Sequence, residues 1–129
     1  ARTKDELGIV QDQKGSPTSA NHIAAVLLKL VLEYKTAQNV IGTYHFTGAP
    51  YSNWYDFALL IFEEGKRFGL IDKIPKVKAL KTSEYPLPAK RPGDSRLDCS
   101  KIFNQIPNLD NDWRSEVTRI VKKLKEQGF

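Results

Sequence analysis

The hydrophobic positions of the first fifty residues change period along the chain. Leu7, Ile9 and Val10 predict a short strand at residues 8–12, and Gly15 and Pro17 predict that residues 13–18 form a loop. In residues 20–35 the apolar positions recur three and four apart, which predicts a helix that Thr18 or Ser19 caps through its hydroxyl group. The apolar stripe of this helix comprises Ile23, Leu27, Leu30, Val31 and Tyr34, and Val26 and Leu28 widen it.

The next segments repeat the order of strand and helix. Aromatic and polar residues alternate over residues 43–47, which predicts a second strand. Ser52 or Asn53 can cap the helix that follows, and Gly69 is its expected C-terminal stop. The apolar face of this helix, which we expect to pack into the core, comprises Trp54, Phe57, Ala58, Ile61, Phe62 and Phe68.

The second half of the chain predicts a long loop and two further helices. Three prolines remove backbone donors from residues 81–94, so this segment is expected to be an ordered loop, and loops of that length are commonly functional. Helices are expected at residues 99–105 and 112–127, with Trp113 in the core. The order strand, helix, strand, helix predicts an α/β fold in a single domain spanning residues 1–129.

The composition adds few constraints to this outline. With 40% apolar and 27% charged residues among 129, the chain is expected to fold around one hydrophobic core. The net charge of +5 favours anionic partners, although most of the basic side chains should be solvated. Aromatic residues do not alternate with the basic ones, so we expect no nucleic-acid binding. No apolar run approaches the roughly 20 residues that cross a bilayer, and Cys99 has no second cysteine, so we expect a cytoplasmic protein without a membrane partner.

Several kinds of catalytic site are missing from the sequence. The eight glycines include no Gly-x-Gly pair, which a dinucleotide fold needs so that its backbone can approach the pyrophosphate. No tyrosine is followed four residues later by a lysine, the pair through which short-chain reductases supply a general acid. The two histidines lack the neighbouring ligands of a zinc site. We therefore expect this chain alone to hold no nicotinamide cofactor and no metal, and to be inactive.

Three stretches of the chain carry a recognisable order of residues. The first is Val-Gln-Asp-Gln-Lys-Gly-Ser-Pro-Thr at 10–18, and the second is Gly-Thr-Tyr-His-Phe-Thr-Gly at 42–48 with Trp-Tyr-Asp-Phe-Ala at 54–58. The third is Tyr-Pro-Leu-Pro-Ala-Lys-Arg-Pro at 85–92, which runs into Ser-x-Leu-Asp-Cys-Ser-Lys at 95–101. In this order and spacing they resemble the carboxy-terminal region of the dTDP-4-dehydrorhamnose reductase family, within the extended short-chain dehydrogenases.

The resemblance implies a small mixed α/β substrate-binding domain that lacks the Rossmann half of the family. The complete enzymes of that family use NADPH or NADH to reduce the 4-keto group of dTDP-6-deoxy-L-lyxo-4-hexulose, giving dTDP-L-rhamnose. The expected partners are the dTDP-sugar, an amino-terminal Rossmann domain and, left open, a second copy in a homo-oligomer. Faces that would pack on the Rossmann half are expected to be exposed and apolar. The alternative is a non-catalytic, reductase-like interaction or regulatory module.

The loop at residues 13–18 supplies four of the seven candidate substrate-binding residues. Gln13 can offer its amide to a base or a sugar hydroxyl, or it can bond its own backbone in a turn. Gly15 and Pro17 are expected to set the path of the loop more than to touch the ligand. We interpret Thr18 as a helix cap in preference to a ligand contact.

The proline-containing loop supplies the other three candidates. Arg91 is the principal one, because a guanidinium can make two parallel charge-assisted hydrogen bonds to diphosphate oxygens, although it can also be a solvated loop residue. Lys90 is a lesser candidate for the same anion. Tyr85 can stack or hydrogen-bond in the site, or it can pack the loop against the body of the domain.

Overall fold

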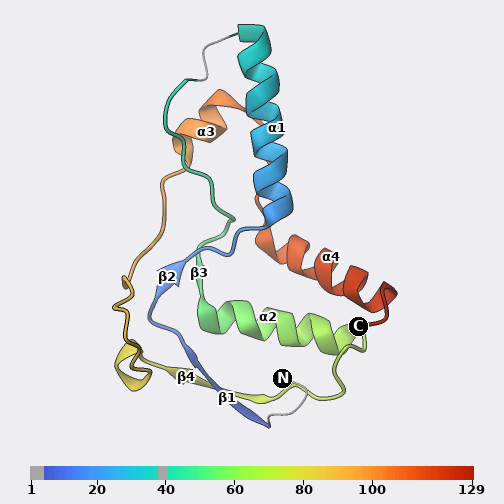
Figure 1. Cartoon of the computed structure of the whole chain (residues 1–129). Helices are drawn as coiled ribbons and strands as arrows, with labels where there is room; N and C mark the ends of the chain where they lie inside the picture. Colours follow the sequence, from blue (N-terminus) through green and yellow to red (C-terminus); the bar gives the residue numbers. More distant parts are fainter. Residues whose placement is uncertain (1–4, 38–40) are drawn as a thin grey trace.

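The computed structural model describes residues 5–37 and 41–129 of the chain. Within these residues the chain forms four α-helices, one short 3-10 turn and two small two-stranded sheets, so the mixed α/β class is confirmed (Figure 1). Helix α1 (Ala20–Ala37) and the short helix α3 (Ser100–Gln105) lie at one end of the molecule. Helices α2 (Trp54–Arg67) and α4 (Trp113–Glu126) lie toward the other end.

The larger sheet joins the beginning of the chain to its middle. Strand β1 (Glu6–Val10) pairs in parallel with β4 (Lys76–Leu80), with Glu6 opposite Lys76 and Val10 opposite Leu80. The predicted strand at residues 8–12 therefore lies two residues too late. It ends early because the side chain of Asp12 turns to accept hydrogen bonds from Thr82, at 2.9 Å from its backbone nitrogen and 2.6 Å from its hydroxyl.

The smaller sheet brings the loop at residues 13–18 against the start of α2. Strand β2 (Lys14–Gly15) is antiparallel to β3 (Ser52–Asn53), with Lys14 opposite Asn53 and Gly15 opposite Ser52. Each strand has only two residues, so the main effect of the pairing is to hold the loop at residues 13–18 against the start of α2. It is this contact that places two of the recognisable stretches side by side.

The helix ends follow the capping signals of the sequence. The side chain of Asn53 accepts a hydrogen bond from the backbone nitrogen of Asp56 at 2.9 Å, which caps α2 as predicted. Gly69 has a φ of +70° just beyond α2, a left-handed conformation that favours glycine and ends the helix. At the first helix the hydroxyl of Ser19, 3.1 Å from the backbone nitrogen of Asn21, is the acceptor. The interpretation of Thr18 as that cap is therefore wrong.

The strand predicted at residues 43–47 is not formed. Among the described residues no strand pairs with this segment, which has no regular secondary structure. Tyr44 and Phe46 pack against a core cluster formed by Val26 of α1 with three residues of α3 and the segment after it, Ile102, Ile106 and Leu109. The alternation of aromatic and polar residues thus reflects which side chains of the segment pack against the core. A strand also needs a second strand to form hydrogen bonds with.

A second core cluster lies between α2 and α4. Trp113, Val117 and Val121 are buried there, and Trp113 is only 2% exposed, as predicted. Phe57 packs on this cluster with Leu60, Ile61, Phe68 and Leu70.

The apolar stripe of α1 is largely uncovered. Leu30 is half-buried and packs against the first core cluster, but the other four residues of the predicted stripe are exposed: Ile23 at 42%, Leu27 at 56%, Val31 at 52% and Tyr34 at 51%. Of the two residues that widen the stripe, Val26 is buried and Leu28 is exposed, so α1 faces the core through Val26 and Leu30 and leaves the rest of the stripe uncovered.

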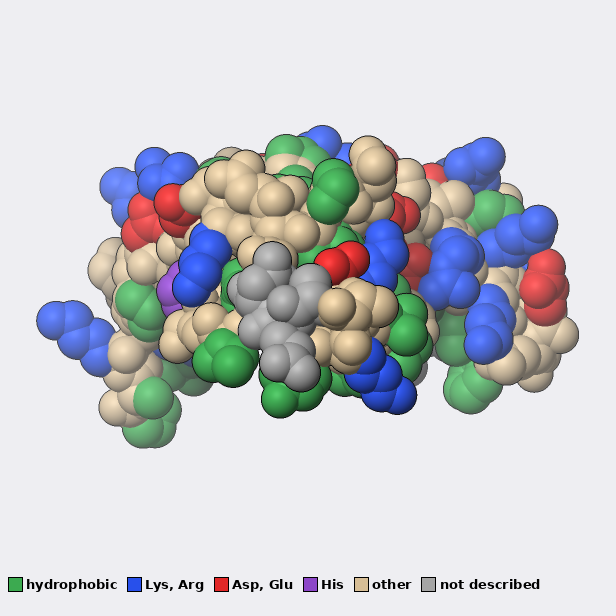
Figure 2. Space-filling view, turned by 90° about the horizontal axis from the view of Figure 1, so that it is seen from above, with side chains coloured by type: hydrophobic (Ala, Val, Ile, Leu, Met, Phe, Trp, Pro, Cys, Tyr) green, Lys and Arg blue, Asp and Glu red, His purple; other side chains and the backbone are tan. Residues whose placement is uncertain are grey.

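The basic side chains are dispersed. Figure 2 shows lysines and arginines scattered across the face seen there, with hydrophobic and acidic side chains between them. None of the described helices has the length and apolar character needed to cross a membrane.

Candidate functional site

The seven candidate residues line two adjoining pockets. The first pocket has a volume of about 410 Å³ and includes Gln13, Tyr85, Lys90 and Arg91 in its wall. The second has a volume of about 480 Å³, and its wall includes Gln13, Gly15, Pro17, Thr18 and Arg91. Two loops that lie some seventy positions apart in the sequence therefore meet here, and Gln13 and Arg91 belong to both pockets.

Gln13 is held in place between the loops. Its side chain is buried, with 8% exposed, and its Nε2 donates a hydrogen bond to the hydroxyl of Thr82 at 3.2 Å. Thr82 itself is bound by the carboxylate of Asp12, and those hydrogen bonds hold the pKa of Asp12 below its ordinary value. Gln13 thus lines both pockets while its side-chain nitrogen is held by Thr82.

The hydroxyl of Thr18 makes structural contacts. It donates to the carbonyl oxygen of Ser16 at 3.2 Å and accepts from the backbone nitrogen of Gly48 at 3.1 Å. Ser16 in turn donates to the carbonyl oxygen of Gly48. These bonds fasten the loop to the segment before α2, so Thr18 lines the second pocket while its polar group is already used.

The proline-containing loop is exposed and is fixed at its end. Gly93 and Ser95 bond the backbone of Lys14 on either side of an isolated bridge between Lys14 and Asp94, with N···O distances of 2.9 Å. Arg96 forms a two-pronged ion pair with Asp94, at 2.6 Å for the shortest N···O distance, and its hydrogen bonds lower the pKa of Asp94 to about 2. The end of the loop is thereby tied to β2.

Arg91 stands at the junction of the pockets without an acidic partner. Within residues 5–37 and 41–129, no carboxylate lies within ion-pair distance of Arg91 or Lys90. Neither pocket has an aspartate or glutamate in its described wall, while Lys14, Lys90 and Arg91 all contribute to it. Positive charge without a counter-charge in a largely apolar cavity favours an anionic ligand.

Trp54 also belongs to both pockets, although its place on the apolar stripe of α2 favoured core packing over ligand binding. The helical periodicity of α2 predicts Trp54 in the core, but its side chain is 51% exposed and faces the two pockets, so that prediction is wrong. Phe57, one turn later, packs into the second core cluster as predicted and also lines the second pocket. As the first residue of α2, Trp54 lies where the helix meets the loop at residues 13–18, a place that only the tertiary contact reveals.

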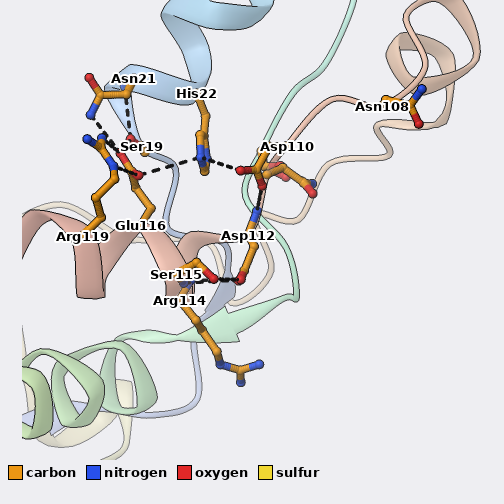
Figure 3. Close-up of polar contacts among 12 residues, drawn as sticks. Ser19, Asn21, His22, Asn108, Asp110, Asp112, Arg114, Ser115, Glu116 and Arg119 are labelled. Atoms are coloured by element: carbon orange, nitrogen blue, oxygen red, sulfur yellow. Dashed lines mark hydrogen bonds and ion pairs between the residues drawn. The ribbon is translucent and has the colours of Figure 1, made fainter.

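A polar cluster ties α1 to α4 (Figure 3). The buried carboxylate of Glu116 accepts hydrogen bonds from the hydroxyl of Ser19 at 2.7 Å and from the side-chain amide of Asn21 at 2.8 Å. Arg119, one turn further along α4, binds the same carboxylate at 2.6 and 2.7 Å. His22 lies nearby, 3.6 Å from Asp110 and 3.9 Å from Glu116. This cluster fixes Ser19, the residue that follows Thr18, and therefore the end of the loop at residues 13–18.

No group of three or more metal-binding side chains is found in the described part of the chain.

Comparisons with known proteins identify the family of the chain. Residues 1–126 match the family model described as the RmlD substrate binding domain. A dTDP-4-dehydrorhamnose reductase from Aggregatibacter actinomycetemcomitans is 40% identical over 121 residues, which make up 93% of this chain and 41% of that protein. The chain therefore spans about two fifths of the length of the curated relatives it matches.

Two crystal structures show the same fold. A dTDP-4-dehydrorhamnose reductase from Clostridium acetobutylicum matches with a TM-score of 0.77 and 35% identity, over 95% of this chain and 40% of that one. The reductase from Bacillus anthracis, solved in complex with NADP, matches with a TM-score of 0.73 and 24% identity, over 90% of this chain and 37% of that one.

Proposed function

Because this chain belongs to the family of RmlD substrate binding domains, we propose that it holds the sugar nucleotide of a dTDP-4-dehydrorhamnose reductase. The proposed contacts are the residues that line the two pockets, with Gln13 and Arg91 as the polar groups common to both. Gly15 and Pro17 shape the loop, Thr18 fastens it, and Tyr85 and Lys90 complete the wall of the first pocket.

The observation that carries this proposal is the unpaired guanidinium of Arg91. It lies where the pockets join, and no acidic residue stands in either described wall. A diphosphate is the group that such an arginine binds best, through two parallel hydrogen bonds. An anion in the middle of two cavities fits a nucleoside diphosphate sugar, which carries one ring on each side of its diphosphate.

The reaction is assigned to the full-length protein. In it, the nicotinamide cofactor, NADPH or NADH, reduces the 4-keto group of dTDP-6-deoxy-L-lyxo-4-hexulose to give dTDP-L-rhamnose. The residues of this chain do not fit the cofactor, since the sequence has no Gly-x-Gly turn for the pyrophosphate and no Tyr-x-x-x-Lys pair. In this proposal those elements belong to a Rossmann part, and the present domain orients the keto sugar against it.

Calorimetry with the 129-residue chain tests the proposal. We expect dTDP to bind weakly, because one side of the site is open, and NADPH not to bind. Arg91→Ala should lower the affinity for dTDP at least about tenfold, the loss expected for charge-assisted hydrogen bonds. Arg114→Ala is the matched control, because Arg114 is exposed on α4 and lines neither pocket. Tight binding of NADPH, or equal effects of the two substitutions, would contradict the assignment.

A non-catalytic interaction module is the second candidate, and the uncovered apolar stripe of α1 favours it. Exposed apolar stripes of this kind commonly mark a contact with another protein surface. For such a module dTDP should leave the melting temperature unchanged, whereas a domain that binds dTDP should be stabilised by it. A thermal melt with and without dTDP therefore separates the two functions.

A further inference from the structure

Thr82, at the start of the proline-containing loop, is held by the carboxylate of Asp12. That carboxylate accepts hydrogen bonds from the backbone nitrogen of Thr82 at 2.9 and 3.0 Å and from its hydroxyl at 2.6 Å. Thr82 is also the first residue of the 3-10 turn Thr82–Glu84, in which the side chain of Glu84 accepts a hydrogen bond from the backbone nitrogen of Lys81 at 2.7 Å. The position of Thr82 is therefore fixed by its own bonds and by those of the turn.

The hydroxyl of Thr82 has a single proton, and Asp12 determines where that proton goes. An ionised carboxylate can only accept hydrogen bonds, so the hydroxyl must donate to Asp12. The lone pairs of the same oxygen remain as acceptors, and they accept a hydrogen bond from Nε2 of Gln13 at 3.2 Å. The direction of both hydrogen bonds in the series Gln13, Thr82, Asp12 thus follows from the negative charge at its end.

This series decides which end of the Gln13 amide faces Thr82. A primary amide can turn over and exchange its donor nitrogen with its acceptor oxygen at almost no change in shape. A hydroxyl whose proton is already used cannot donate to the amide oxygen, so the amide must present its nitrogen to Thr82. Because Gln13 is buried and lines both pockets, a ligand there meets this amide in one orientation.

Asp12 itself is exposed and is not part of the described wall of either pocket. Its influence on a ligand must therefore pass through Thr82 and Gln13. We propose that Asp12 is a positioning residue for the sugar nucleotide, which fixes the amide of Gln13 through the hydroxyl of Thr82. This inference rests on the proposed function and adds to it a residue that acts without touching the ligand.

Calorimetry with dTDP tests the inference in three variants. Asp12→Asn keeps the shape of the side chain but adds a donor, which frees the hydroxyl of Thr82 to donate to the amide oxygen of Gln13 instead. Thr82→Val removes the hydroxyl at similar volume. We expect each of these to weaken dTDP binding about fivefold, the order of one net hydrogen bond, and Thr82→Ser to stay within about twofold of wild type because it keeps the hydroxyl.

Asp72→Asn is the matched control, because Asp72 is exposed and lines neither pocket, so the same change of charge should leave the affinity unchanged. A double-mutant cycle separates positioning from a purely structural role. In Gln13→Ala no amide remains to be oriented, so the further substitution Asp12→Asn should weaken dTDP no more.

Two results would overturn the inference while the proposed function stands. One is that Asp12→Asn lowers the melting temperature but leaves the affinity for dTDP unchanged. The other is that it weakens dTDP equally with and without Gln13, since Asp12 would then only anchor the loop. If the wild-type chain binds no dTDP at all, the inference and the proposed function both fail.

Discussion

Glu116 is a buried acidic residue whose negative charge is stabilised by hydrogen bonds from three side chains. Its carboxylate is 6% exposed and lies between the first turn of α1 and its own helix. The hydrogen bonds from Arg119, followed by those from Ser19 and Asn21, hold the pKa of Glu116 well below its ordinary value of 4.5. A carboxyl group whose pKa is depressed by folding stabilises the folded chain above pH 4.5, and that stability is lost as the pH falls toward the folded-state pKa.

Glu116→Gln should expose this dependence. A neutral amide cannot accept all of these hydrogen bonds, so we expect the free energy of unfolding to fall by about 1–3 kcal/mol near neutral pH. The difference from wild type should shrink at about pH 3.5, where the unfolded carboxyl group is already protonated. Denaturant titrations at both pH values measure it, with Glu126→Gln, an exposed carboxylate on the same helix, as control. A loss of stability that is independent of pH would argue against the charged network.

Individual residues also show how much of the candidate site could be predicted from the sequence. Gln13 and Arg91 were selected for their side-chain chemistry, and the structure places both at the junction of two pockets. Their contact with a ligand stays a prediction. The prediction that Trp54 lies in the core was wrong. Helical periodicity shows which residues share a face of the helix, but residues far away in the sequence decide what packs against that face.

At the scale of elements, Gly48 joins the loop at residues 13–18 to the segment before α2. It is buried between Pro17 and Trp113, and a Cβ atom added there would overlap the carbonyl oxygen of Pro17. The backbone of Gly48 also bonds Thr18 and Ser16. A glycine is needed at this point because the two backbones approach too closely for a side chain.

Gly48→Ala should therefore push the loop at residues 13–18 away from the segment before α2. We expect a loss of about 1–3 kcal/mol in the free energy of unfolding, as for an overpacked core, together with weaker dTDP binding. Gly93→Ala is the control, because nothing lies within 4 Å of a Cβ atom at that position. Thermal melts of the two variants give the comparison, and equal melting temperatures would show that the loop adapts freely.

Elements that depend on neighbours within one turn were predictable. The four helices and the cap at Asn53 follow from local spacing and side chains. Strand β4 was missed and the strand at residues 43–47 was wrongly predicted, because a strand exists only with a partner. The partner of β4 is β1, far away in sequence, and within the described residues the segment at 43–47 has none.

At the scale of the whole molecule, the uncovered stripe of α1 should govern behaviour in solution. Leu27 and Val31 lie one turn apart and are 56% and 52% exposed. Such a stripe favours self-association through apolar contact. We expect the chain to elute from size-exclusion chromatography at a volume that depends on concentration, and Leu27→Gln with Val31→Gln to shift it toward the monomer.

Ile120→Gln is the matched control for that experiment, since Ile120 is a lone exposed apolar residue on α4, with 39% exposed. It should leave the elution volume unchanged. A wild-type chain that runs as a monomer at every dilution would show that the stripe causes no association.

The sequence by itself determined the helices, the loop that interrupts them, and the three stretches by which the chain resembles its family. These depend on side-chain spacing, on proline and glycine, and on residue order, all of which are local properties. Only the tertiary structure decided the β1–β4 pairing, the exposure of α1, and the meeting of Gln13, Trp54 and Arg91 around two pockets. Burial and pairing are properties of two surfaces at once, and the second surface comes from residues that no local pattern identifies.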